Sequence, residues 1–326
     1  PIGTLIWKLA PAIAAGNTVV IKPSERASCS TLELMKILEE ADLPEGLINV
    51  VTGFGPTTGA PLIEHQDVRM ISFTGGTKGG SAASLSASKN VKPIIMELGG
   101  KSPQIIFKDA DLTLSVNGVV SGIFPVSGHS CISGSRILVH KDIKDKFTHN
   151  LLEVVKKAKV GHPNDTATQI GPIANKEQYE FILSKIEAAE KRGLKLLIDG
   201  RKEQKSKGYY IGPTIFDNVP NKDELAQNEV FGPVASIQTW EDEDEVIKIA
   251  NDTIYGLAAG IWTMDTNKAI RLADKIEAGT VYINNYFNAS TQSPVGGFKQ
   301  SGYGRENGWE GMQSYMQTKS TWLATN

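Results

Sequence analysis

Cys131 is the residue of this chain whose type and setting are best suited to covalent chemistry. It lies in GIFPVSGHSCISGSR, residues 122–136, where glycine and serine surround the sulfur and a hydrophobic run follows. Small neighbours let a substrate approach the thiol and leave backbone N–H groups free to face an oxyanion. A structural cysteine lies more often within an apolar periodic segment. This segment alone leaves two interpretations open, a catalytic nucleophile and an inert thiol buried in a loop.

Two further residues bear on this thiol chemistry. His129 lies two residues before Cys131, which suggests a Cys–His dyad. Residues at i and i+2 of a loop seldom face each other, so we favour a nucleophile without this partner. Cys29 follows Ser28 at a predicted helix start, where the helix dipole lowers a thiol pKa. We interpret Cys29 as a small packing residue.

Glu97 and Glu229 are carboxylates at the edges of predicted strands. Glu97 ends an apolar strand and is followed by LGGKSP, a flexible junction. Partial burial there would raise its pKa towards that of a general base. The alternative is a strand-end acid that pairs with Lys101. Glu229 precedes Phe231 and a Gly-Pro turn, which taken alone is typical of an ordinary loop.

Three other segments suit a nucleotide. Residues 51–59, VTGFGPTTG, follow a strand and open a predicted helix, and residues 73–77, FTGGT, form a second strand-end glycine turn. The first spacing is one residue longer than the usual dinucleotide fingerprint, and a plain tight turn explains each segment equally well. Two such turns together favour a nucleotide site. In IKPSE, residues 21–25, a carboxylate could accept two ribose hydroxyls, or Ser24 could simply cap a helix.

The predicted elements describe an α/β protein with two domains. In the first hundred residues, short β-branched strands alternate with helical patterns, which predicts parallel βαβ units in a sheet covered on both faces. A second α/β cycle begins after residue 103. The glycine-rich loop 286–305 is too long for a simple connection, and the alternating segment 315–323 predicts an edge strand that pairs outside its own domain. The predicted strands are residues 18–22, 48–51, 70–73, 93–97, 104–107, 137–140, 233–239, 257–262 and 279–284.

Composition narrows the class of protein. The 326 residues carry a formal net charge of −2, which gives no reason to expect nucleic acid or an acidic membrane surface. No apolar run reaches the length of a membrane helix. The two cysteines form no CxxC pair, so we expect neither a disulfide framework nor a metal cluster, and we expect a reduced, cytoplasmic setting. The chain opens within a helix-like pattern without an initiator methionine, and we therefore expect a fragment.

Taken together, these segments resemble the aldehyde dehydrogenase superfamily. They occur in the family's order and cover the whole chain, and Glu97 before LGG points to the NAD(P)-dependent hydrolytic branch. The matching segments are WKLAPAIAAGNTVVIKPSE (7–25), FTGGTKGG (73–80), MELGGKSPQIIF (96–107), GHSCISGSR (128–136), NEVFGPV (228–234) and SPVGGFKQSGYGRE (293–306).

The resemblance implies a role for each matching residue. Cys131 would be the nucleophile and Glu97 the base that activates water for deacylation. Glu229 and Phe231 would hold the nicotinamide riboside. The remaining cofactor-binding positions implied by the resemblance are Lys22, Ser24, Glu25, Gly55, Gly59, Phe73, Thr74, Gly75, Gly76, Thr77, Leu98 and Gly99, together with Glu97 itself.

The chain departs from the family pattern in four places. Glutamine is usual where His129 stands, phenylalanine where Val295 stands and serine where Gly76 stands. The family also has an asparagine immediately upstream of the position matching Pro1, and its amide forms half of the oxyanion hole. Because that residue is absent here, we expect the chain by itself to be poorly active.

The resemblance implies a Rossmann-like cofactor domain, residues 1–102, and a catalytic domain, residues 103–298. Residues 299–326 would be a return segment with an oligomerisation strand. The expected reaction is oxidation of an aldehyde to a carboxylic acid with NAD, with NADP tolerated, in a homodimer or homotetramer. Two alternatives stay open, an inactive or binding-only relative and a thiol esterase that uses no nicotinamide.

Overall fold

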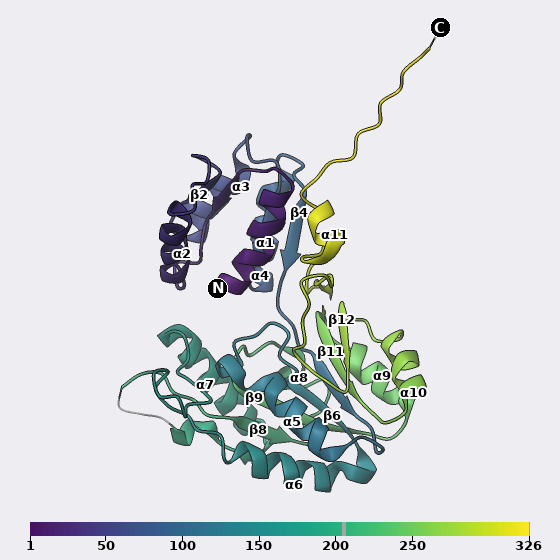
Figure 1. The fold of residues 1–326 in the computed structure, drawn as a ribbon. Coiled ribbons are helices and arrows are strands. Elements are labelled where there is room, and N and C mark those ends of the chain that lie inside the picture. Colours follow the sequence, from purple (N-terminus) through teal and green to yellow (C-terminus); the bar gives the residue numbers. More distant parts are fainter. Residues whose placement is uncertain (204–206, 326) are drawn as a thin grey trace. The chain divides into compact units, whose positions relative to one another are not determined.

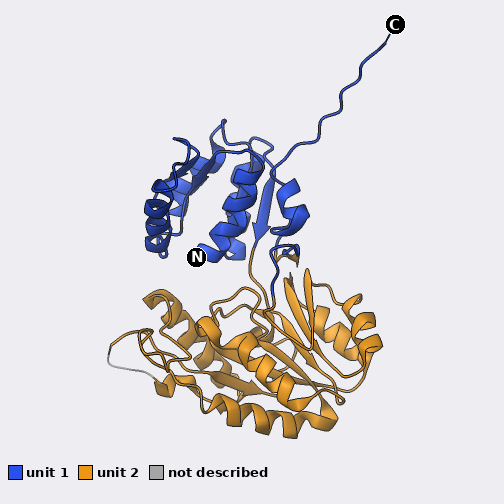
Figure 2. Cartoon of the chain, in the orientation of Figure 1, with its two compact units in different colours: residues 1–97, 289–296, 302–326 blue, residues 98–288, 297–301 orange. Residues whose placement is uncertain are grey.

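The computed structural model describes residues 1–203 and 207–325. The chain forms two compact units, and it passes between them more than once (Figure 2). Unit 1 comprises residues 1–97, 289–296 and 302–326, and unit 2 comprises residues 98–288 and 297–301. The first crossing at residues 97 and 98 lies close to the predicted boundary at residue 102. The functional roles given to the two domains stay predictions.

Unit 1 contains two separate pairs of parallel strands with helices beside them (Figure 1). The parallel pairing agrees with the predicted βαβ units, but no single sheet joins the four strands described. The first pair is also less covered than predicted, because Val20 is 45% exposed while Ile21 is buried. Its elements are α1 (Ile2–Ala14), β1 (Val19–Ile21), α2 (Cys29–Glu39), β2 (Ile48–Val50), the π-turn η1 (Gly55–Gly59), α3 (Ala60–Glu64), β3 (Ile71–Thr74), α4 (Thr77–Ser88), β4 (Ile94–Glu97) and α11 (Gly308–Gln313).

Unit 2 is built on a seven-stranded sheet of order β12-β11-β5-β6-β9-β8-β7. All neighbouring strands are parallel except β7 and β8, which are antiparallel. A small antiparallel pair, β10 (Tyr255–Gly256) and β13 (Phe298–Lys299), lies outside this sheet. The strands of the large sheet are β5 (Pro103–Ile106), β6 (Arg136–His140), β7 (Lys195–Ile198), β8 (Thr214–Asp217), β9 (Val234–Trp240), β11 (Ala258–Trp262) and β12 (Thr280–Ile283).

Helices cover both faces of this sheet, which explains why its central strands are continuously apolar. Alternate residues of β6 enter two different cores, because successive side chains of a strand point to opposite faces. Ile137 packs in the core that contains helices α5 and α6, whereas Leu138 packs in the core that contains α9 and α10 (Figure 1). The helices of unit 2 are α5 (Leu112–Ile123), α6 (Lys144–Val155), α7 (Lys176–Lys191), α8 (Glu224–Gln227), α9 (Glu243–Asn251) and α10 (Thr266–Ala273), with short 3-10 turns η2 (Pro125–Gly128), η3 (Lys141–Ile143) and η4 (Gly200–Glu203).

Two features of the fold differ from the sequence predictions. Strands β7 and β8 were not predicted, and they form the antiparallel pair at one edge of the sheet. The segment 315–323 forms no strand, because none of the strands described pairs with it, and its Tyr315 carbonyl instead accepts a hydrogen bond from the Asn17 side-chain amide at 3.0 Å. Trp322 and Leu323 in it are 94% and 86% exposed. Pairing of this segment with another chain stays a prediction.

The described residues bear on two questions, whether a helix could cross a membrane and whether a metal ion could be bound. None of the helices in this part of the chain has the length and apolar character required to cross a bilayer. Among the same residues, no cluster of three or more histidine, cysteine or acidic side chains could hold a metal ion.

Candidate functional site

The turn that carries Cys131 is held in place by glycines of neighbouring segments. A Cβ added to Gly100 would lie 2.2 Å from the carbonyl oxygen of Cys131, and a Cβ added to Gly128 would lie 2.2 Å from the backbone of Gly232. Only glycine permits these approaches. Before the cysteine, Val126, Ser127 and Gly128 adopt φ values of 54°, 55° and 73°, a left-handed run that is strained for valine.

The half-buried thiol of Cys131 lies near two phenols. Burial, followed by the charge of Cys131, raises the pKa of Tyr282. The neighbouring Tyr286 donates a hydrogen bond from its hydroxyl to the carbonyl of Ile132 at 2.7 Å, which fixes the backbone directly after the cysteine. The rings of Tyr282 and Tyr286 pack with centroids 4.8 Å apart. Strand β12 and the segment that follows it therefore support the turn that carries Cys131.

His129 does not act as a partner of this thiol in the structure. Its Nδ1 lies 3.1 Å from the carbonyl oxygen of Val126, and its Nε2 is buried without a hydrogen-bond partner among the described residues. Burial lowers the pKa of His129, and backbone hydrogen bonds oppose that shift. These contacts agree with the interpretation of a nucleophile without a Cys–His dyad.

Glu229 lies on the loop after α8 and faces the Gly99–Gly100 backbone. Its Oε1 accepts a hydrogen bond from the N–H of Gly100 at 3.0 Å, and a Cβ on Gly99 would lie 2.4 Å from Oε2. Burial raises the pKa of Glu229, whereas the Gly100 N–H and the charge of Lys101 lower it. Leu98 and Gly99 are themselves fixed by Ser301, which accepts from the Leu98 N–H at 2.9 Å and donates to the Gly99 carbonyl at 2.6 Å.

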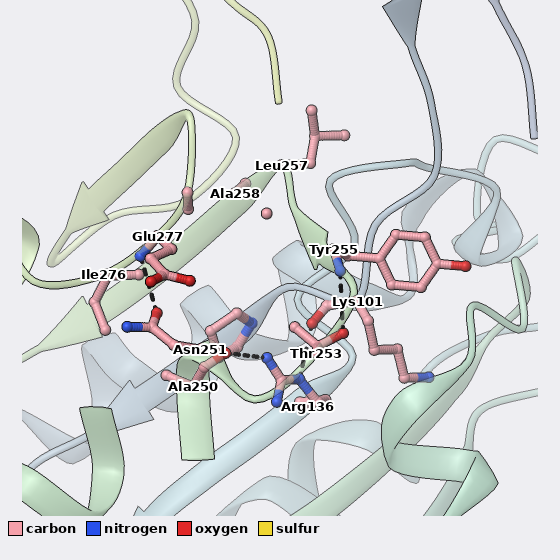
Figure 3. A pocket seen from close by; sticks show the side chains of 13 residues that line it. Lys101, Arg136, Ala250, Asn251, Thr253, Tyr255, Leu257, Ala258, Ile276 and Glu277 are labelled. Carbon is pink, nitrogen blue, oxygen red and sulfur yellow. Dashed lines mark hydrogen bonds between the residues drawn. The ribbon is translucent and has the colours of Figure 1, made fainter. Parts of the chain in front are cut away.

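Lys101 is a buried lysine that the sequence suggested as a partner of Glu97, but the carboxylate that acts on it in the structure is Glu229. Its side chain is 2% exposed, and burial, followed by the charge of Arg136, lowers its pKa to about 7. Glu229 opposes this shift. The guanidinium of Arg136 donates to the carbonyls of Lys101, Ile249 and Ala250 at 2.6–2.9 Å, and it thereby caps the end of α9 beside a small hollow (Figure 3).

Glu97 ends strand β4 in unit 1 and is 6% exposed. Its Oε1 has no hydrogen-bond partner among the described residues. Burial, followed by the charge of Glu306, raises the pKa of Glu97 to about 8, and Lys8 and Arg305 oppose this shift. A carboxyl group in this state can take up and release a proton near neutral pH, which is what a general base requires.

Lys8 and Glu306 are the residues that the sequence analysis missed around Glu97. Glu306 forms an ion pair with Lys8 and accepts a hydrogen bond from Ser72 at 3.2 Å. The backbone of the 302–306 segment lies beside β4, since the Met96 N–H donates to the Tyr303 carbonyl at 2.8 Å. Both residues lie in segments that resemble the family. The signal that could have identified Lys8 is its charge within the otherwise apolar helix 2–14.

The first glycine turn brings three predicted nucleotide-binding residues together in unit 1. Lys22 donates to the carbonyl of Gly53 at 3.2 Å and lies 3.8 Å from the Glu25 carboxylate. A Cβ on Gly59 would touch the Lys22 side chain at 3.4 Å. Gly55 and Gly59 begin and end the π-turn η1, which leads into α3 as the sequence predicted.

Ser24 is not a helix cap, which corrects one of the alternatives. Its hydroxyl accepts from the Arg26 N–H at 3.3 Å, and helix α2 begins later, after Ser28. The turn 22–28 is long enough to separate Ser24 from the first helical N–H groups.

The second glycine turn joins β3 to α4. Phe73 and Thr74 end the strand, and a Cβ on Gly75 would lie 2.9 Å from the Phe73 ring. Gly76 precedes the helix and has open space around it, so the serine usual in the family would fit. Thr77 is the first residue of α4, and its buried hydroxyl has no partner among the described residues. An unpaired hydroxyl at the N-terminus of a twelve-residue helix suits a phosphate.

These features define a class of protein, an α/β fold with a thiol on a turn pinned by glycines and nucleotide-type turns at strand ends. A family model described as "Aldehyde dehydrogenase family" matches residues 1–321. The chain therefore belongs to the aldehyde dehydrogenase family, which confirms the predicted resemblance and fold class.

Individual relatives support this assignment over nearly the whole chain. Aldehyde dehydrogenase 1A1 of Gallus gallus is 46% identical over 321 residues, which are 98% of this chain and 63% of that protein. Betaine aldehyde dehydrogenase of Bacillus subtilis is 42% identical, with 98% and 66% covered. The solved NAD+ complex of an aldehyde dehydrogenase from Bacillus cereus has a TM-score of 0.97 at 37% identity, with 100% and 66% covered. The chain thus spans about two thirds of the length of the relatives it matches.

Proposed function

We propose that this chain carries the catalytic residues of an NAD-dependent enzyme that oxidises an aldehyde to a carboxylic acid. The observation that carries the proposal is the Cys131 turn, where Gly100 and Gly128 fix the backbone around a half-buried thiol. A rigid turn of small residues positions a nucleophile and its backbone N–H groups before the substrate arrives. Family membership directs this arrangement towards aldehydes.

In the proposed reaction, the Cys131 thiolate forms a bond to the carbonyl carbon, and the carbonyl electron pair moves onto oxygen. The backbone N–H of Cys131 is the donor that we assign to this alkoxide. NAD, when bound, supplies the hydride acceptor. Oxidation leaves a thioester on Cys131. Glu97 then takes a proton from water, the hydroxyl oxygen bonds to the thioester carbon, and the C–S bond breaks to return the thiolate and release the acid.

The residues present fit a dinucleotide. The unpaired Thr77 hydroxyl and the open space at Gly76 suit a pyrophosphate at the start of α4. We assign Lys22, Ser24 and Glu25 to the adenine ribose, Gly55 and Gly59 to the adenosine side, and Glu229 and Phe231 to the nicotinamide riboside. Phe73, Thr74, Gly75, Leu98, Gly99 and Glu97 complete the proposed lining. The relative from Bacillus cereus is described as an NAD+ complex.

The first test separates the two thiols. NAD or an aldehyde should change the rate at which iodoacetamide labels Cys131. Cys29 is exposed, and neither compound should change its labelling rate. Cys131→Ala should abolish aldehyde-dependent formation of reduced cofactor, and the matched control Cys29→Ser should retain it. Activity that survives Cys131→Ala, or ester hydrolysis by Cys131 without any cofactor reduction, would reject the proposal.

The second test concerns the choice of cofactor. The Glu25 carboxylate can accept ribose hydroxyls and would repel a 2′-phosphate, so we propose a preference for NAD that Lys22 moderates. Glu25→Gln should raise kcat/KM for NADP relative to NAD by about tenfold, since one repulsive charge is removed. A wild-type chain that uses NADP better than NAD contradicts the role of Glu25.

We further propose a cytoplasmic homo-oligomer. Trp322 and Leu323 are large apolar side chains on a segment that lacks a strand partner within the described chain, and a neighbouring subunit could cover them. Two free thiols agree with a reducing compartment. Light scattering of Trp322→Ser should report a smaller assembly than the wild type, and an unchanged mass would remove this support.

A further inference from the structure

His129 and Phe231 make an aromatic contact between two loops of unit 2. Their ring centroids are 5.4 Å apart and their planes are at 89°, an edge-on arrangement. Phe231 adopts φ 52° and its ring remains 37% exposed, so one side is available to a ligand. The family resemblance does not account for this contact, because glutamine is usual where His129 stands.

The two loops are fixed to each other beside this contact. Gly128 and Gly232 approach so closely that a Cβ on Gly128 would lie 2.2 Å from the Gly232 backbone. Ser127 anchors the first loop by donating to the Gly171 carbonyl at 2.9 Å. Gln178 of helix α7 anchors the second by donating to the Phe231 carbonyl at 3.0 Å. The orientation of the Phe231 ring is therefore left to the group that packs against it, which is the imidazole.

The contacts of the imidazole favour its neutral form. Its Nδ1–H donates to the Val126 carbonyl, so in the neutral ring Nε2 carries a lone pair. Nε2 is buried and has no partner among the described residues. Protonation would place a charged N–H there without an acceptor, which is strongly unfavourable. Burial also lowers the pKa of His129, in agreement with a neutral ring.

We propose that His129 is a positioning residue for Phe231, whose neutral imidazole holds the ring that packs against the nicotinamide half of the cofactor and releases it when protonated. This inference rests on the proposed function. It assigns a control of cofactor binding at acid pH to a histidine that stands where glutamine is usual in the family.

Other titratable groups face this contact and must be separated from it. Glu229 lies on the Phe231 loop, with a raised pKa, and Lys101 lies beside Glu229. Cys131 follows on the loop of His129. From helix α7, Gln178 donates to the Phe231 carbonyl and the Ile182 side chain lies against Gly232, and both side chains are uncharged. The variants must therefore remove His129 and Glu229 one at a time.

The main experiment measures the Kd for NAD by fluorescence titration from about pH 5 to about pH 8, the range in which histidine changes charge. We expect wild-type affinity to fall about tenfold on the acid side, equivalent to one unfavourable buried contact. His129→Gln, which restores the family residue and cannot titrate, should lose this acid-side fall. Glu229→Gln should keep it. The same acid-side fall in wild type and His129→Gln would overturn the proposal.

A second measurement does not depend on cofactor binding. NMR titration should follow the His129 imidazole protons in the wild type and in Phe231→Leu. Removing the aromatic ring opens the burial of His129, so its pKa should rise towards the ordinary histidine value. An unchanged titration in Phe231→Leu would overturn the positioning contact. If the chain fails to bind NAD at all, the proposed function is rejected, and this titration alone decides the contact.

Discussion

Glu97 in unit 1 is a buried carboxylate and Glu229 in unit 2 is a half-buried one, and their surroundings differ. Burial raises the pKa of both. Glu229 accepts a hydrogen bond from Gly100 and has the cation of Lys101 nearby, and both favour its charged form. Glu97 has an oxygen without a hydrogen bond and a second carboxylate, Glu306, as neighbour, which disfavours charge. The environment thus suits Glu97 to proton transfer and Glu229 to accepting hydrogen bonds from a ligand.

The largest effects are expected when the charge of Glu97 or of Glu229 is removed, which tests the roles assigned to the two carboxylates. Glu97→Gln should still form the thioester and show a burst of reduced cofactor, but steady turnover should fall by about 10²–10⁴, the usual contribution of a general base. Glu229→Gln should instead raise the KM for NAD by about tenfold, since it weakens a charged acceptor. Stopped-flow and steady-state absorbance separate the two effects. A lost burst in Glu97→Gln, or the same effect from both variants, would contradict the assigned roles.

Lys101, the cation near Glu229, is expected to make the free energy of unfolding depend on pH. Its folded pKa of about 7 lies below the unfolded value of 10.5, so the unfolded state binds more protons between these values. Its contribution to stability is therefore present above about pH 10 and is lost as pH falls through 7. At about 1.4 kcal/mol per pKa unit, wild type should gain up to a few kcal/mol in unfolding free energy between pH 7 and pH 9.

The matched variants for this prediction are Lys101→Met and Lys108→Met. Lys101→Met should lose the gain in stability with pH, because its side chain cannot titrate. Lys108 is exposed, so Lys108→Met should keep it. Denaturant unfolding at several pH values provides the measurement. The same change in stability between pH 7 and pH 9 in the wild type and in Lys101→Met would refute the burial argument for Lys101.

The smallest expected effect concerns the neighbours of Glu97. Glu306 raises the pKa of Glu97 and Lys8 lowers it. Glu306→Gln should move the acid limb of the deacylation pH profile to lower pH by about one unit, and Lys8→Met should move it to higher pH by about as much. Thermal unfolding of each variant controls for damage to the fold. Shifts of both variants in the same direction would show that these charges do not set the proton affinity of Glu97.

Most of the regular elements were predictable because their sequences carry a clear period. Strand β6 at Arg136–His140 matches the predicted run 137–140 within one residue, and strand β12 at Thr280–Ile283 lies within the predicted run 279–284. The strands β7 and β10 were not predicted, because each is defined by its pairing with another segment, β7 with β8 and β10 with β13. The separation of the unit 1 strands into two pairs was likewise invisible, because pairing is a property of neighbours in space.

The sequence by itself predicted which residues carry the chemistry, because the segments around Cys131, Glu97 and Glu229 together resemble one family. It also determined the family, since the matching segments extend along the whole chain. The proton affinity of those groups depends on the tertiary structure. Lys8 and Glu306 are 298 residues apart and meet beside Glu97, and Lys101 lies buried beside Arg136. Proton affinity depends on burial and on the nearest charges, and both are set by which distant segments the fold brings together.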